Sequence, residues 1–195
     1  MAFGSWKIEV NIGGYPQKVA TAIAKLAEEK LGAMYKGVAY LGSQVANGIN
    51  HAVLAEQTVL TGEDTKNAVI LIFNEKPGDD RVTLVAVERL AESGEAFGGT
   101  KIDVTTDIPE DAKEAFEAAF GEGFVGSVVT PIALLGTQLA HGVNYIFAVE
   151  VKPVVENPES KVTVATVNAS TMTVCFTDAL SNKHEGILKY AFSWI

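Results

Sequence analysis

Apolar and polar residues alternate along the first segment of the chain. The apolar positions are Trp6, Ile8, Val10 and Ile12. This period of two predicts a half-buried β-strand over residues 6–12. Gly13 and Gly14 end the strand, and Pro16 suits the first turn of a helix. Apolar residues spaced three to four apart then predict an amphipathic helix over residues 16–30.

Longer extended segments follow the helix, separated by glycine-rich and polar turns. In the first half of the chain we expect strands over residues 38–46, 49–60, 66–74 and 82–90. In the second half we expect a strand over 101–105, a short helix over 109–120, and strands over 132–140, 143–151, 161–167 and 171–176. The second half therefore repeats the order of the first.

The repeat is visible in the residues themselves. Residues 41–50, LGSQVANGIN, align without a gap with residues 135–144, LGTQLAHGVN, and six of the ten positions are identical. The same offset of 94 pairs Phe3-Gly4 with Phe97-Gly98. A unit of this length suits a small domain. We predict two domains, residues 1–93 and 94–195, with the boundary in the small and polar stretch 91–96.

The order of the expected elements predicts the fold class. One helix is followed by strands that are joined by short turns, and this order occurs twice. We expect an α+β architecture in which each domain packs one helix on a four- to five-stranded antiparallel sheet.

The eight residues Gln138–Tyr145, QLAHGVNY, resemble the first inhibitory hairpin of the cystatins, which reads Gln-Val-Val-Ala-Gly, one residue, then Asn-Tyr. Residues 44–51 carry a looser form of the same pattern. The resemblance implies two cystatin-like domains and a non-enzymatic inhibitor that occludes the cleft of a papain-type cysteine protease. The protein-binding residues that it implies are Gln44, Val45, Ala46, Asn47, Gly48, Gln138, Leu139, Ala140, His141 and Gly142, with Gly13 or Gly14 as the N-terminal element. The Pro-Trp hairpin of that family is absent from both repeats.

An assembly role is the alternative function. The chain ends in an apolar run of period two, whose large side chains are Leu188, Tyr190, Phe192 and Trp194. This run either completes the sheet of the second domain or pairs with a neighbouring subunit, because a terminal strand can add to an exposed sheet edge. The second possibility would make the protein a component of a homo-oligomer or of a virion, with these four residues at the interface.

Composition narrows the possible partners. The 195 residues carry a formal net charge of −9, which argues against binding a nucleic-acid backbone. No apolar run approaches a membrane span, and the first residues do not resemble a signal peptide, so we expect a cytoplasmic protein with a protein partner. The single cysteine, Cys175, excludes an intrachain disulfide and is expected to be buried. The three histidines show no metal-ligand spacing, and we expect no metal, no cofactor and no catalytic residues.

Overall fold

The computed structural model describes residues 4–29, 32–61, 63–94, 98–121, 125–180 and 191–192. The contacts of the chain divide into two compact units, Met1–Ser93 and Gly94–Ile195. Each unit is described below on its own.

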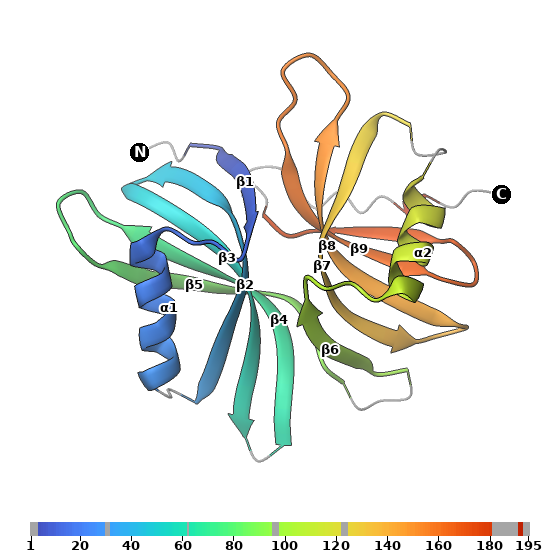
Figure 1. Ribbon diagram of the computed structural model, residues 1–195, viewed down its shortest axis with the longest axis horizontal. Helices are drawn as coiled ribbons and strands as arrows, with labels where there is room; N and C mark the ends of the chain where they lie inside the picture. The colour runs from blue at the N-terminus through green and yellow to red at the C-terminus, as the bar shows by residue number, and fades with distance from the viewer. Residues whose placement is uncertain are drawn as a thin grey trace. The chain divides into compact units, whose positions relative to one another are not determined.

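The first unit is a five-stranded antiparallel sheet with one helix on it. Its elements are β1 (Trp6–Ile12), α1 (Gln17–Glu29), β2 (Ala33–Ala46), β3 (Gly48–Thr61), β4 (Glu63–Glu75) and β5 (Val82–Glu92). The strands lie in sequence order, β1-β2-β3-β4-β5. Figure 1 shows α1 lying along one face of this sheet. Val19 of α1 is fully buried there and packs with Val53, Leu71 and Phe73 of the central strands.

The second unit repeats this order and adds a strand. Its elements are β6 (Thr100–Thr105), α2 (Glu110–Phe120), β7 (Ser127–Leu139), β8 (Val143–Pro153), β9 (Lys161–Asn168), β10 (Val174–Asp178) and β11 (Ala191–Phe192). The sheet order is β11-β10-β9-β8-β7-β6. The chain's C-terminal strand therefore forms one edge of this sheet.

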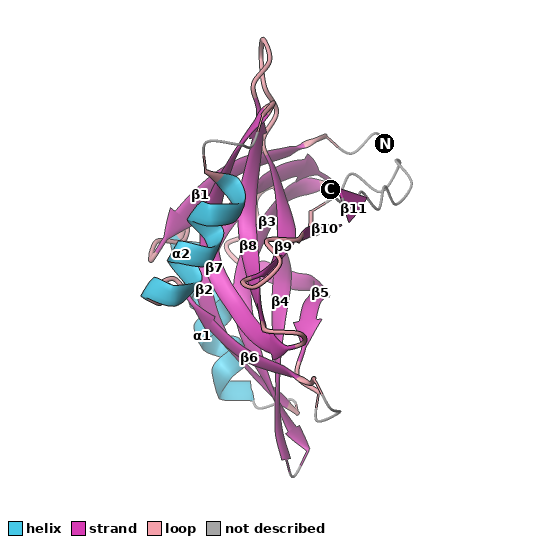
Figure 2. Cartoon of the chain, turned by 90° about the vertical axis from the view of Figure 1, so that its right-hand side faces the viewer, coloured by secondary structure: helices cyan, strands magenta, loops and turns pink. Residues whose placement is uncertain are grey.

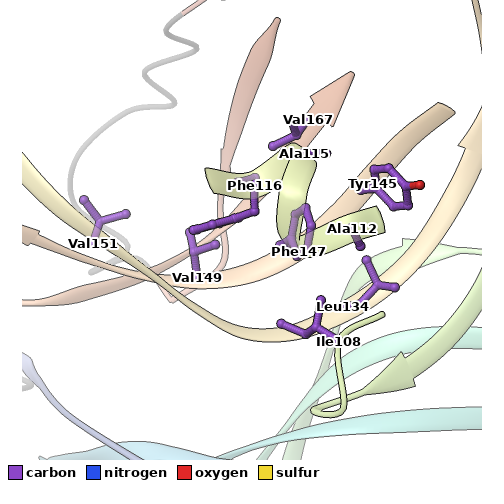
Figure 3. Packing of buried hydrophobic residues seen from close by; sticks show 11 residues of the cluster. Ile108, Ala112, Ala115, Phe116, Leu134, Tyr145, Phe147, Val149, Val151 and Val167 are labelled. Carbon is purple, nitrogen blue, oxygen red and sulfur yellow. The ribbon is translucent and has the colours of Figure 1, made fainter. Parts of the chain in front are cut away.

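Aromatic residues fill the core between α2 and its sheet. Phe116 of α2 lies edge-on to Phe147 of β8, with 5.1 Å between the ring centroids (Figure 3). Phe120 stacks at 4.6 Å on Phe116 and reaches Phe176 of β10. Such pairs contribute beyond the area that they bury. The cluster fixes α2 on the sheet.

The central strands are buried on both faces, unlike the alternating β1. In β3 the residues Ala52–Ala55 are all fully buried, and in β4 the run Ala68–Phe73 is buried throughout. A strand that is covered on both faces has a continuous apolar sequence rather than an alternating one. These runs account for much of the chain's positive mean hydropathy, +0.19.

The predicted fold class, α+β with two cystatin-like domains, is wrong. The structure is mostly β (Figure 2): about 60% of the described residues lie in strands and 13% in helices. The physical reason is the length of the hairpin strands: β2 and β3 have 14 residues each and β4 has 13, whereas α2 has only 11. Periodicity gives the type of each element, but it underestimated how far these strands extend.

The prediction of a buried Cys175 is also wrong. Cys175 is a free and exposed thiol on β10. The residues of β10 alternate between partly buried and exposed, and Cys175 falls on the exposed side, between the core-facing Val174 and Phe176. A short strand near the sheet edge exposes every second residue, which the apolar neighbours in sequence did not reveal.

Candidate functional site

Three segments of the first unit meet at one end of its sheet. They are the start of β1, the tight turn between β2 and β3, and the turn between β4 and β5. The Gly4 amide donates to the Val45 carbonyl oxygen at 2.9 Å. Gly48 lies so close to the end of β4 that an added Cβ would clash with the Glu75 carbonyl oxygen. We call this end of the unit tip 1, with the β2–β3 turn at its centre.

A row of side-chain amides crosses the sheet directly behind tip 1. Asn74 donates to Asn50 at 2.8 Å, and Asn50 donates to Gln44 at 3.1 Å. Gln44 in turn donates to the Gly4 carbonyl oxygen at 2.9 Å. This amide ladder ties four neighbouring segments together and fixes the register of the hairpin. Gln44 is therefore used inside the fold rather than offered to a partner.

The second unit builds the same arrangement 94 residues later, at tip 2, which is centred on the β7–β8 turn. Asn168 donates to Asn144 at 2.7 Å, and Asn144 donates to Gln138 at 3.1 Å. Gly98 occupies the place of Gly4, and its position beside the Leu139 carbonyl oxygen would bring an added Cβ to 3.0 Å. The two repeats thus share one framework at this end.

The framework explains most of the identities in the repeated motif. The identical positions are Leu41/Leu135, Gly42/Gly136, Gln44/Gln138, Ala46/Ala140, Gly48/Gly142 and Asn50/Asn144. The leucines are fully buried, and a Cβ on either Gly42 or Gly136 would clash with the backbone of the neighbouring edge strand. Gly48 and Gly142 adopt φ of 109° and 108°, which disfavours any side chain. Only the identity of the alanine pair lacks a structural reason. Most identities in the motif are therefore explained by what the fold requires.

Several residues between those identities face solvent. Val45 is 72% exposed, and its equivalent Leu139 is 71% exposed. Ile49 is also exposed, and so are Asn47 and His141 at the apex of each turn. A large apolar side chain held in solvent at the same place in both units is the clearest sign of a binding surface.

Gly13 and Gly14, predicted as the N-terminal element of the wedge, lie elsewhere. Ile12 pairs with Ala39, seven residues before the turn of the β2–β3 hairpin, which places these glycines roughly 20 Å from tip 1. The glycine beside tip 1 is Gly4. The pairing of Phe3-Gly4 with Phe97-Gly98 in the repeat was the signal that could have identified it.

Sequence reasoning also missed a buried polar network below tip 1. The Tyr40 hydroxyl lies 2.9 Å from His51 Nδ1, and His51 Nε2 lies 3.3 Å from a Glu75 carboxylate oxygen. The other Glu75 oxygen accepts from Lys18 Nζ at 2.7 Å. A neutral His51 with its proton on Nε2 satisfies both partners. The hydrogen bond from Lys18, followed by the one from His51, lowers the pKa of Glu75, whereas burial raises the pKa of Tyr40.

The second unit replaces this network with a single pair. The Tyr145 hydroxyl donates to Asp111 at 2.8 Å, and burial together with the Asp111 carboxylate raises the pKa of Tyr145 to about 12. Tyr145 stands where His51 stands in the first unit, and Ala169 stands in the place of Glu75. Both arrangements link the hairpin to the helix, since Lys18 and Asp111 belong to α1 and α2.

Most residues of the predicted C-terminal interface lie outside the part of the chain that the structure describes. Leu188, Tyr190 and Trp194 fall outside the described residues. Phe192 belongs to β11, which pairs with β10 through Val174–Phe192 and Cys175–Ala191. Of the two predicted roles for this run, the described part adopts the first, because it extends the second unit's own sheet.

Within the described ranges, no three His, Cys, Asp or Glu side chains gather as a metal site. Neither α1 nor α2, over the residues that the structure describes, is long and apolar enough to cross a membrane. No protein-family model, curated protein or solved structure matches the chain. The resemblance of the tip motif to the cystatins therefore stays a prediction that rests on its eight residues.

Proposed function

We propose that the chain is a non-enzymatic protein-binding protein in which tip 1 and tip 2 each insert independently into the groove of a partner molecule. A papain-type cysteine protease is the partner that the tip motif favours. The observation that carries this proposal is the matched exposure of Val45 and Leu139, each beside the apex of a hairpin that an amide ladder holds in place.

Rigidity supports this role. An exposed hairpin that keeps one conformation before binding loses little conformational entropy when it is bound. The amide ladder, the tight glycine turn and the attached start of β1 all restrict tip 1 in this way. A protruding apolar anchor on a rigid support is a frequent source of binding energy at interfaces.

The convergence of three segments also supports an occluding wedge. At tip 1 the glycine at the start of β1, the β2–β3 turn and the β4–β5 turn lie together, and the same three positions meet at tip 2. Neither β4–β5 nor β9–β10 carries a tryptophan in its turn. The affinity of each tip would therefore rest mainly on its central turn.

Inhibition of papain tests the proposal. The wild-type chain should inhibit cleavage of a small peptide substrate at micromolar concentrations, competitively and reversibly. Replacing both anchors, Val45→Asp with Leu139→Asp, should weaken inhibition at least tenfold per tip. Val128→Asp is the matched control, because Val128 is a 55% exposed valine at the opposite end of the β7–β8 hairpin. The proposed partner is wrong if the wild-type chain at micromolar concentration leaves papain fully active.

An assembly role is a second candidate, and a different surface favours it. The outer edge of β5 has no strand partner among the described residues, whereas β11 covers the outer edge of β10. An open edge of 11 residues offers unpaired backbone groups to another chain. Measuring the mass of the purified protein in solution tests this role, since a monomer at high concentration would contradict it.

A further inference from the structure

The two sheets end in equivalent edge strands. β5 pairs with β4 in the first unit, as β10 pairs with β9 in the second. Leu84 of β5 lies opposite Phe73, and Val174 of β10 lies opposite Val167. Phe73 and Val167 are 94 residues apart, so they are the same position of the repeat. Leu84 and Val174 therefore mark the same place on the two edges.

These edges differ in what covers them. Val174 pairs on its outer side with Phe192 of β11. No strand of the described residues pairs with the outer side of β5. β5 also exposes two valines, Val85 at 55% and Val87 at 40%. Among the described residues, a strand therefore pairs with the outer edge of β10, and none pairs with the outer edge of β5.

We propose that the outer edge of β5 binds the C-terminal strand of a second copy of this chain. This inference rests on the assembly role proposed above as the second candidate. Each chain has two equivalent edges, β5 and β10, and one C-terminal strand, β11. In an exchange, the strand that pairs with β10 of its own chain would leave it and pair with the same place on β5 of another copy. The alternating apolar residues of the run 187–195 suit a half-covered edge.

The register of β5 indicates where the added strand lies. β5 pairs with β4 without interruption from Ala86 to Arg89, between two irregularities. Bulges at an edge hinder indiscriminate pairing, so they confine an incoming strand to the regular stretch. Val87 lies at its centre. A contact between an edge and a terminal strand is heterologous, so it builds a dimer by reciprocal exchange, a ring or a longer chain.

Self-association measured by analytical ultracentrifugation provides the first test. The wild-type chain should associate, and Val87→Lys should weaken association at least tenfold, because a lysine on an edge strand opposes pairing. Val128→Lys, which replaces a more exposed valine outside β5, should leave association unchanged. A wild-type monomer at all concentrations would overturn both this inference and the assembly role. Association that Val87→Lys leaves unchanged would overturn the inference alone.

Disulfide trapping provides the second test, on full-length chains in a Cys175→Ser background. One preparation carries Ala86→Cys and the other carries Ala191→Cys with a size tag. Ala86 lies opposite Ile72 as Cys175 lies opposite Thr166, and Cys175 is the residue that faces Ala191. After mixing and mild oxidation, we expect the mixed disulfide between the two preparations on a non-reducing gel. Glu9→Cys replaces Ala86→Cys in the control, because Glu9 is exposed on β1, at the other edge of the same sheet. Equal trapping by Glu9→Cys, or no mixed disulfide, would overturn the inference.

Discussion

The two units share the framework of their tips but differ in what lies beneath. In both, an amide ladder and a strained glycine hold an exposed apolar residue in place. Beneath tip 1 the Tyr40–His51–Glu75 network reaches Lys18 on α1, whereas a single bond between Tyr145 and Asp111 serves the second unit. The two repeats therefore share the geometry of the tip, whereas different residues connect the tip to the helix in each unit.

The largest expected effect is a loss of stability when a core residue is truncated, and this loss should differ between the two hydrophobic cores. Phe147 contacts Phe116 in the second unit, and the equivalent position in the first unit is Val53. Phe147→Ala should lower the free energy of unfolding by about 4 kcal/mol, because it leaves a large cavity. Val53→Ala removes only two methyl groups and should cost about 2 kcal/mol. Urea unfolding followed by circular dichroism measures both, and equal losses would contradict the larger contribution that we assign to the aromatic cluster of the second unit.

Replacing the turn glycines should have the next largest effect on stability, and the effect should differ between the two tips. A Cβ on Gly48 meets the Glu75 backbone carbonyl, whereas a Cβ on Gly142 meets the Ser170 side chain, which can move. Gly48→Ala should therefore destabilise the fold by about 3 kcal/mol and Gly142→Ala by about 2 kcal/mol. Adding Ser170→Ala should recover part of the second loss and none of the first. These glycines are poor probes of binding, since their replacement disturbs the hairpin itself.

The last members of the two amide ladders differ in a smaller way. The side-chain oxygen Oδ1 of Asn168 accepts three further hydrogen bonds, from the backbone amides of Ser170 and Thr171 and from the Thr171 hydroxyl. Within the described ranges, the Asn74 side chain hydrogen-bonds only to Asn50. Asn168→Ala should cost about 2 kcal/mol and Asn74→Ala about 1 kcal/mol. A larger loss for Asn74→Ala in urea unfolding would contradict this ranking.

Acid should weaken the first unit through Glu75. The pKa of this carboxyl lies below its ordinary value of 4.5, because the hydrogen bonds from Lys18 and then from His51 stabilise the charged form. Its contribution to stability is therefore complete above pH 4.5 and disappears as the pH falls through the lowered pKa. Glu75→Gln should be less stable than the wild type at pH 7, and the gap should narrow as the pH falls toward 3. Thermal unfolding at a series of pH values measures it, and a gap independent of pH would rule out this linkage.

Sequence reasoning predicted the repeat and the surface at the hairpin turns, because both leave local signals. The alternation in β1 and the repeated Gln-x-x-x-Gly-x-Asn pattern are such signals. The length of the strands was missed, because a continuous apolar run such as Ala68–Phe73 carries no signal of where a strand that is buried on both faces ends. The network around His51 was also missed. Its members come from α1, β2, β3 and β4, and only folding brings them together.

The central claim is that each tip is an independent binding element built around one exposed anchor. Titration of papain of known active-site concentration tests it most directly. Val45→Asp and Leu139→Asp should each change the free energy of unfolding by less than about 0.5 kcal/mol, because both positions are exposed. The wild-type chain should occupy two protease molecules, each single variant one, and the double variant none. Inhibition that persists unchanged in the double variant would contradict the claim.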